Sequence, residues 1–270
     1  MSIRWSSPTL FNDLLEFQRM PVFEPDIVES YPIYIKRIIE IVFDEKPYDE
    51  NFSAKTKLLI LLNQSLKKTG MSKEELYNEI SIPAPADQQR MTDLLREHTE
   101  NENYIKNARI CCLTENYKND VMWAHYADNN TGCVIGFRLL KHIDTPFIAA
   151  KKIKYTDGKP EIGSALNFLL YGDTFELRRK THEAICFTKD IKWSYENEWR
   201  TISWMSETTD QLYVDYKFYT EELESLTMGP NIKDIHKKNL LQLIKENYHS
   251  CDLYEMKVVY GEYKRETINV

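Results

Sequence analysis

Two glutamates and an arginine alternate along residues 193–200, which read WSYENEWR. In an extended strand, residues two apart point to the same face, so Glu196, Glu198 and Arg200 would project together. Two carboxylates at one place suit general acid–base catalysis, and their repulsion raises the pKa of at least one of them. The alternative is an acidic strand edge that Arg200 neutralises, because structural ion pairs also cluster charge.

An aromatic and histidine-containing segment, MWAHYAD, occupies residues 122–128. Trp123 and Tyr126 are three residues apart, so on a helical turn they share a face that could stack on a planar ligand. His125 could donate a hydrogen bond to a phosphate or ribose oxygen. The alternative is a packed aromatic corner with His125 bonded to the backbone. We favour packing for Trp123 and a functional role for His125.

Polar residues near the N-terminus are weaker candidates. Asn12 and Asp13 follow an aromatic residue at the end of a candidate strand, and Ser6 lies six residues before Asn12. Such residues are good turn formers, and this structural interpretation suffices for them. Their functional alternative is a polar clamp on ribose or phosphate.

The composition is that of an ordinary folded protein, 42% hydrophobic and 29% charged over 270 residues. A formal net charge of -7 argues against binding to nucleic acid or anionic lipid through bulk charge alone. The longest aliphatic run, residues 58–62, is too short to span a bilayer, and no secretory signal follows Met1. We therefore expect a cytoplasmic protein that does not engage a membrane.

Several kinds of catalytic or metal site have no pattern in the sequence. The five cysteines include no CxxC pair, and free thiols in a reducing compartment are the simplest interpretation. The six histidines are dispersed and show no HExxH spacing, so no metal is predicted. There is also no phosphate-binding GxGxxG or P-loop and no GxSxG elbow.

Periodicity divides the chain into a helical part and a mixed part. Residues 28–101 show the 3.6-residue apolar pattern of some four helices, with a capping box at Ser72 and Glu75 and breaks at Pro83 and Pro85. From about residue 105, strands alternate with single helices. The predicted strands cover residues 109–113, 131–137, 151–155, 199–205, 212–216, 223–228 and 253–259, and the predicted helices cover 161–189, divided at Gly172, and 232–248. We predict one α+β domain over residues 1–270, carrying a helical insertion or lobe at 28–101.

Three stretches taken together resemble a known family. They are residues 5–13 (WSSPTLFND), residues 112–137 with the MWAHYAD and GCVIGF motifs, and residues 193–200 (WSYENEWR), followed by LTMGP at 226–230. In this order they are similar to family 2971 of the bacterial domains of unknown function. The family usually has a further strand ahead of the first motif, which this sequence lacks, and Leu14-Leu15-Glu16 replaces its Pro and acidic positions. A ligand-binding residue on that strand would have to come from elsewhere.

The motif order of this family is in turn similar, more distantly, to that of ADP-ribosyltransferases, some of which act as toxins or anti-phage effectors. The resemblance implies a mixed, split β-sheet core. It also implies an enzyme that uses NAD as a substrate. It implies Glu198 as the main catalytic carboxylate, assisted by Glu196 and His125. The remaining candidates, Tyr126, Trp123, Arg200, Asn12, Asp13 and Ser6, would bind NAD.

The resemblance leaves three functions open. The first is an ADP-ribosyltransferase-like enzyme that modifies a nucleic-acid or protein acceptor and is held in check by an inhibitory protein bound to residues 28–101. The second is a catalytically inactive nucleotide- or protein-binding module of the same fold. The third is a metal-dependent nuclease, because carboxylates brought together by folding leave no local sequence pattern.

Overall fold

The computed structural model describes residues 2–80, 85–99, 102–207 and 210–268. It has the α+β composition expected from the sequence. The chain divides into two compact units, and each is described by itself. Unit 1 comprises Met1–Phe11, Ile105–Tyr155 and Lys189–Val270, and unit 2 comprises Asn12–Tyr104 and Thr156–Thr188. The predicted insertion at 28–101 falls within unit 2. This unit also includes residues 12–27, which precede the predicted insertion, and residues 156–188, which follow later in the chain.

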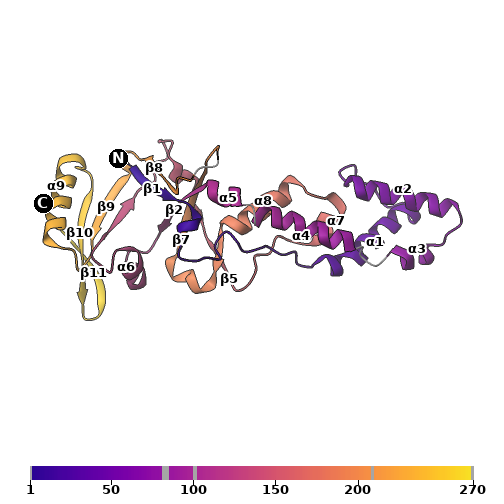
Figure 1. The fold of residues 1–270 in the computed structure, drawn as a ribbon, viewed down its shortest axis with the longest axis horizontal. Helices are drawn as coiled ribbons and strands as arrows, with labels where there is room; N and C mark the ends of the chain where they lie inside the picture. The colour runs from indigo at the N-terminus through magenta and orange to yellow at the C-terminus, as the bar shows by residue number, and fades with distance from the viewer. Residues whose placement is uncertain (1, 81–84, 100–101, 208–209, 269–270) are drawn as a thin grey trace. The chain divides into compact units, whose positions relative to one another are not determined.

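Unit 1 contains a five-stranded antiparallel sheet in the order β4-β7-β2-β1-β8 (Figure 1). The strands are β1 (Ser2–Ser6), β2 (Ala108–Thr114), β4 (Lys151–Lys152), β7 (Glu198–Trp204) and β8 (Tyr213–Lys217). The register of β2 and β7 is continuous, from Ala108 opposite Trp204 to Thr114 opposite Glu198. Trp5, Cys111 and Phe147 form the buried core on one side of this sheet. The sheet thereby fixes where β7 begins, and with it the position of Glu198.

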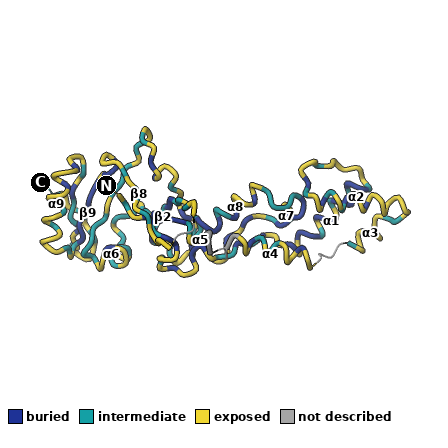
Figure 2. Tube along the Cα trace, turned by 45° about the horizontal axis from the view of Figure 1, so that its top comes forward, coloured by how far each residue is buried: buried dark blue, intermediate teal, exposed yellow. Residues whose placement is uncertain are grey.

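A second sheet in unit 1 has the order β11-β10-β9-β3. Its strands are β3 (Cys133–Phe137), β9 (Leu223–Met228), β10 (Asp252–Val259) and β11 (Glu262–Thr267). The helix α9 (Asp234–Asn247) connects the parallel neighbours β9 and β10, and its Ile244 packs with Leu226 and Leu253. Parallel strands need such a crossover, which explains the predicted strand–helix–strand pattern at 223–259. Figure 2 shows the resulting buried stretch along β9.

Shorter elements complete unit 1, and some of them lie where the chain passes from one unit to the other. They are α5 (Glu102–Asn107), α6 (Asp120–Tyr126), the two-stranded sheet of β5 (Lys154–Thr156) and β6 (Thr188–Asp190), and the 3₁₀ turns at Pro8–Leu10, Pro146–Ala149, Ile191–Glu196 and Thr220–Glu222. The predicted strand 151–155 is divided into β4 and β5 at the buried Ile153, whose amide bonds to the carbonyl of Glu198.

Unit 2 is helical. Its helices are α1 (Ile27–Phe43), α2 (Ala54–Lys68), α3 (Lys73–Ile80), α4 (Pro85–Thr99), α7 (Ala165–Tyr171) and α8 (Phe175–Cys186), packed around a common apolar core. The capping box of Ser72 and Glu75 is confirmed by reciprocal hydrogen bonds of 3.2 and 2.8 Å. Gly172 ends α7 at a φ of 76°, a conformation that glycine adopts without strain, so the predicted division of 161–189 is also confirmed. Pro83 lies outside the described residues.

The helices that the structure describes are each too short or too polar to span a lipid bilayer.

Candidate functional site

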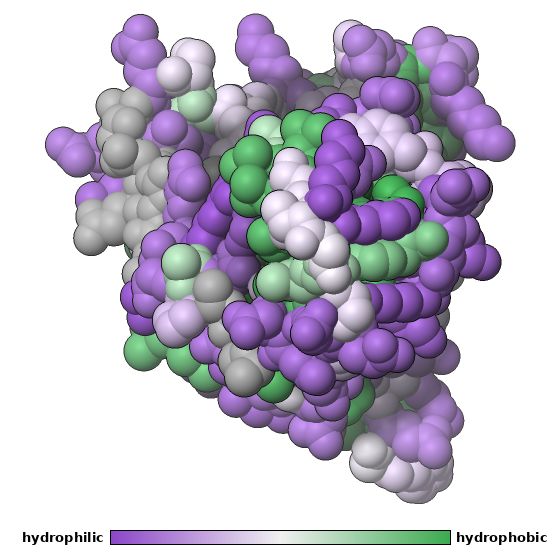
Figure 3. Space-filling model, turned by 90° about the vertical axis from the view of Figure 1, so that its right-hand side faces the viewer, coloured by the Kyte–Doolittle hydropathy of each residue, from purple (hydrophilic) through white to green (hydrophobic). Residues whose placement is uncertain are grey.

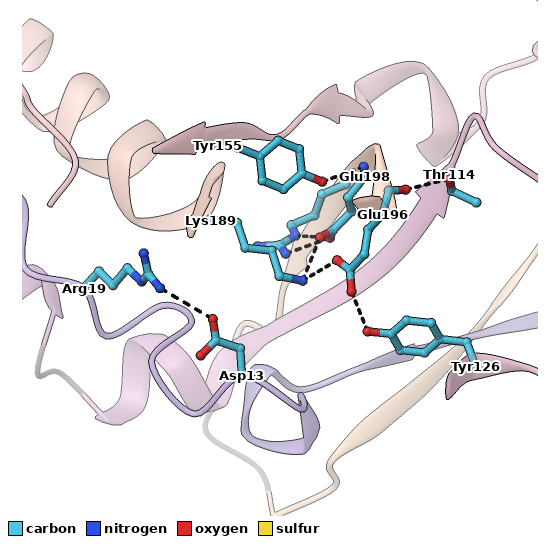
Figure 4. Close-up of polar contacts among 9 residues, drawn as sticks. Asp13, Arg19, Thr114, Tyr126, Tyr155, Lys189, Glu196 and Glu198 are labelled. Atoms are coloured by element: carbon cyan, nitrogen blue, oxygen red, sulfur yellow. Dashed lines mark hydrogen bonds and ion pairs between the residues drawn. The ribbon is translucent and has the colours of Figure 1, made fainter. Parts of the chain in front are cut away.

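Lys189 lies between the two glutamates that the sequence singled out. Its Nζ is 2.7 Å from Oε2 of Glu196 and 3.1 Å from Oε2 of Glu198 (Figure 4). Both glutamates are only 3% exposed, and Lys189 is buried with them. Since an isolated buried charge is costly, one shared ammonium group is what allows two carboxylates to remain this close.

Arg200 supplies the second positive charge. Its Nε and Nη2 donate to Oε1 of Glu198 at 2.9 and 2.7 Å, and its side chain is fully buried. Glu198 and Arg200 are two residues apart on β7, so the expected alternation onto one face holds for this pair. The guanidinium carbon also lies 5.6 Å from the ring centre of Phe11.

Glu196 reaches the same place by a different route from the one predicted. It does not belong to a strand: it ends the 3₁₀ turn Ile191–Glu196, and Asn197 then adopts a left-handed conformation at a φ of 45°. The prediction of one strand carrying both glutamates is therefore wrong. Asparagine tolerates this conformation better than most residues, and the reversal it produces brings Glu196 beside Glu198. The Oγ1 of Thr114 on β2 holds the turn by donating to the carbonyl of Glu196 at 2.6 Å.

Charge compensation sets the ionisation of Glu198. Burial acts to raise its pKa, but the positive charges of Arg200 and Lys189 outweigh burial and hold the pKa below its usual value. At Glu198 the shift is thus opposite to the increase expected for two neighbouring carboxylates, because two cations face the two anions. A carboxylate of this kind stays ionised at neutral pH and acts as a fixed negative charge.

Tyr126 links the buried glutamates to the surface. It ends α6, and its hydroxyl donates to Oε1 of Glu196 at 2.6 Å, while the residue as a whole is 51% exposed. Figure 4 shows its ring directed at Glu196. The side chain of Asn119 caps the start of α6, accepting from the amide of Met122, and its Nδ2 donates to the carbonyl of Tyr195 at 2.7 Å. The helix and the 3₁₀ turn are in this way held to one another.

The other two candidates on α6 have different surroundings. Trp123 is buried with Ala127 and Met256, and its Nε1 donates to the carbonyl of Tyr117 at 2.8 Å. This is the packed arrangement favoured for it, and it leaves the ring no face for stacking on a ligand. His125 is exposed, lies edge-on to Tyr126 with ring centres 6.2 Å apart, and makes no hydrogen bond to a described residue.

The N-terminal candidates belong to other elements than Glu196 and Glu198. Ser6 is in β1, an interior strand of the five-stranded sheet, opposite Ile110 and Tyr213. Asn12 and Asp13 belong to unit 2. Asp13 forms the turn expected of it: its Oδ1 accepts from the amide of Leu15 at 3.0 Å, and its Oδ2 lies 3.7 Å from Nη2 of Arg19.

Sequence reasoning missed Lys189, Thr114 and Tyr155. The Tyr155 hydroxyl accepts the amide hydrogen of Glu198 at 2.9 Å, and burial is the main cause of the raised pKa of this phenol. Lys189 had one indirect signal: Arg200 alone cannot balance two buried carboxylates, so a second cation was required somewhere in the chain. We call Lys189, Glu196, Glu198, Arg200 and Tyr126 the charge cluster.

The charge cluster contains two positive and two negative side chains, which are buried, and one phenol that reaches solvent. Among the described residues, no group of three or more His, Cys, Asp or Glu side chains could hold a metal ion. A fixed carboxylate, a second carboxylate in contact with a surface phenol and an exposed imidazole nearby are groups that can bind hydroxyls and move protons.

Comparison with known proteins bears on part of the chain. Residues 122–201 match the family described as "Protein of unknown function (DUF2971)", which confirms the resemblance to a domain of unknown function. The matched stretch contains every member of the charge cluster and also His125 and Tyr155. No curated protein and no solved structure matches the chain.

Proposed function

Since residues 122–201 match the model of a family of unknown function, we propose a function from the charge cluster they contain. The chain is an ADP-ribosyltransferase-like enzyme that transfers ADP-ribose from NAD to a nucleic-acid or protein acceptor. One observation carries this proposal: two buried carboxylates share Lys189, and Glu196 is connected to solvent through the half-exposed Tyr126.

In the proposed reaction, the bond between nicotinamide and ribose C1′ breaks and its electron pair leaves with nicotinamide. The ribose then carries oxocarbenium-like positive charge, which a nearby fixed carboxylate stabilises. Glu198 suits this role because Arg200 and Lys189 keep its pKa low and its negative charge permanent. The acceptor forms the new bond to C1′, and Glu196 takes the acceptor's proton.

NAD fits the charge cluster only if one existing contact is exchanged. Each of the four carboxylate oxygens of Glu196 and Glu198 already accepts a bond from Lys189, Arg200 or Tyr126. Of these three donors, Tyr126 is the exposed one. A ribose hydroxyl that replaces the Tyr126 phenol at Oε1 of Glu196 satisfies the same acceptor, so the exchange leaves no buried oxygen without a donor. His125, exposed beside Tyr126, is placed to donate to a phosphate or ribose oxygen of the entering NAD.

The test is incubation of the purified chain with NAD labelled in its adenylate part, together with cell lysate. We expect label to be transferred to macromolecules and nicotinamide to be released. Glu198→Gln should abolish both while the protein remains folded by circular dichroism. Glu255→Gln is the matched control, because Glu255 is an ion-paired glutamate of the same unit, bonded to Lys237 at 2.7 Å. Undiminished transfer by Glu198→Gln, or none by the wild type, would contradict the proposal.

A second function is favoured by the completeness of the ion pairing. With both carboxylates paired and 3% exposed, the charge cluster resembles a structural network as much as an open active site. On this account the chain is a binding module that recognises a nucleotide without breaking it. Calorimetric titration with NAD separates the two functions: binding with nicotinamide release supports the enzyme, and binding of intact NAD supports the module.

A further inference from the structure

Helix α2 of unit 2 has one face packed against the rest of the unit and an apolar face that is exposed. Thr56, Ile60 and Asn63 are buried against the rest of the unit. The Thr56 hydroxyl donates to the carbonyl of Leu169 at 2.9 Å and bonds to the Tyr34 hydroxyl at 3.1 Å. These contacts fix the orientation of the helix about its own axis, and so determine which residues point outward.

The outward face is a stripe of leucines. Leu58, Leu61, Leu62 and Leu66 are 57%, 59%, 53% and 38% exposed. Their spacing of three and four residues places them along one side of a helix, opposite Ile60 and Asn63. Apolar side chains show among hydrophilic ones on the end of unit 2 where α2 and α3 lie (Figure 3). Single exposed leucines are ordinary, but four in register on one helix mark an interaction surface.

The charge of α2 has one sign. Residues 54–68 contain Lys55, Lys57, Lys67 and Lys68 and no Asp or Glu. Lys55 is paired with Asp87. Within the described part of the chain, the other three have no carboxylate at ion-pair distance: Lys57 and Lys67 donate to the backbone carbonyls of Glu50 and Val42, and Lys68 is exposed. Lys57 and Lys68 are eleven residues apart, which places both along one edge of the leucine stripe.

We propose that the leucine stripe of α2 docks an acidic amphipathic helix of a partner protein. The stripe extends over about 12 Å of helix axis, a length that an apolar face of two to three turns covers. Glutamates or aspartates flanking the partner's apolar residues would compensate Lys57 and Lys68 along the edge of the stripe.

Two other candidate partners of the leucine stripe are a second copy of this chain and an anionic membrane. The charges and the shape of the surface disfavour both. A second copy would bring the same acid-free helix, so lysines would meet lysines and nothing would compensate them. An anionic membrane would attract the lysines, but the chain as a whole carries a net charge of -7 and is repelled by such a surface. The stripe is also narrow, because Lys57 and Gln64 border the leucines on one side, and the partly buried Leu59 and the buried Asn63 follow on the other.

The probe for the experiment is a synthetic amphipathic helix with leucines three and four apart and glutamates on both flanks. Its binding to the full chain is measured by fluorescence anisotropy, beside a peptide that has lysines in place of the glutamates. We expect saturable binding of the acidic peptide and none of the basic one. The double variant Leu61→Asp/Leu62→Asp should weaken binding roughly tenfold or more, because it removes the centre of the contact.

Two further variants make the result specific. Ile33→Asp is the matched control: Ile33 is 52% exposed in the same unit but lies on α1, so its replacement should leave binding unchanged. Lys57→Glu/Lys68→Glu should reverse the preference in favour of the basic peptide. Equal binding of the two peptides overturns the proposal. Co-sedimentation of the chain with phosphatidylserine vesicles also overturns it. So does a dimer of the wild type that the Leu61→Asp/Leu62→Asp variant does not form. The measurement uses no NAD, so its outcome is independent of the activity proposed for unit 1.

Discussion

The phenolic oxygen of Tyr126 lies 2.6 Å from Oε1 of Glu196, across 70 residues of chain. One partner is half exposed and the other is buried among charges, so this bond connects the charge cluster to solvent. The structural role of the bond and its proposed exchange for a ribose hydroxyl can be separated by experiment, because the first predicts a loss of stability and the second a change in NAD affinity.

Removal of the phenol tests the structural role. We expect Tyr126→Phe to lower the free energy of unfolding by about 1 kcal/mol or less, since water can replace a half-exposed donor. Urea denaturation measures the change. Tyr260→Phe serves as the control, because Tyr260 is 99% exposed at the turn between β10 and β11. A cost above about 3 kcal/mol would mean that Oε1 of Glu196 is left without a donor, contrary to the exposure of Tyr126.

Lys189 should be far more important for stability. Lys189→Met leaves two buried carboxylates facing one cation, and we expect a loss of about 3–5 kcal/mol. The double variant Lys189→Met/Glu196→Gln restores charge balance and should be less destabilised than the single one, which a double-mutant cycle detects. For comparison, Lys237→Met breaks the partly exposed pair with Glu255 and should cost about 1 kcal/mol or less. Equal losses for the two lysines would argue that the charge cluster is accessible to water.

Helices and strands were predictable from the sequence where periodicity is local. The strands on both sides of α9 follow from apolar spacing, and the division at Gly172 follows from the presence of a glycine in a helical pattern. The place of Glu196 was not predictable, because period-two alternation through residues 196–200 fits a strand equally well. The left-handed Asn197 that ends the 3₁₀ turn becomes visible only in three dimensions.

The other residues that sequence reasoning missed or could not separate depend on contacts between distant parts of the chain. Lys189 lies at the end of a segment with helical periodicity, and nothing near it marks it as the partner of Glu196 and Glu198. Trp123 and Tyr126 share the spacing of one helix face, but packing against Met256 takes Trp123 into the core while Tyr126 bonds to Glu196. Spacing gave the candidates, and tertiary packing decided between them.

The low pKa of Glu198 makes stability depend on pH. Protonation of Glu198 favours the unfolded chain, in which its pKa is about 4.3. The contribution of Glu198 is therefore present above that value and is lost as the pH falls toward the lower pKa of the folded state. We expect the wild type to lose more stability than Glu198→Gln between about pH 5 and pH 3. Urea denaturation of both proteins across this range measures the difference, and parallel curves would show that the pKa of Glu198 is not lowered.

Two adjacent cysteines on β2 report on access to the charge cluster. Cys111 is buried in the core, and burial raises the pKa of its thiol to about 12, so almost none of it is thiolate at neutral pH. Cys112 is exposed, points to the other face of the sheet and hydrogen-bonds to Glu198. We expect iodoacetamide to label Cys112 in the folded protein and Cys111 only after unfolding, with peptide mass spectrometry as the measurement.

Because Cys112 contacts Glu198, NAD bound at the charge cluster should slow the labelling of Cys112. Cys251, partly exposed in the same unit, is the internal control and should be unaffected by NAD. Labelling of Cys112 that is insensitive to saturating NAD would place any nucleotide away from Glu198.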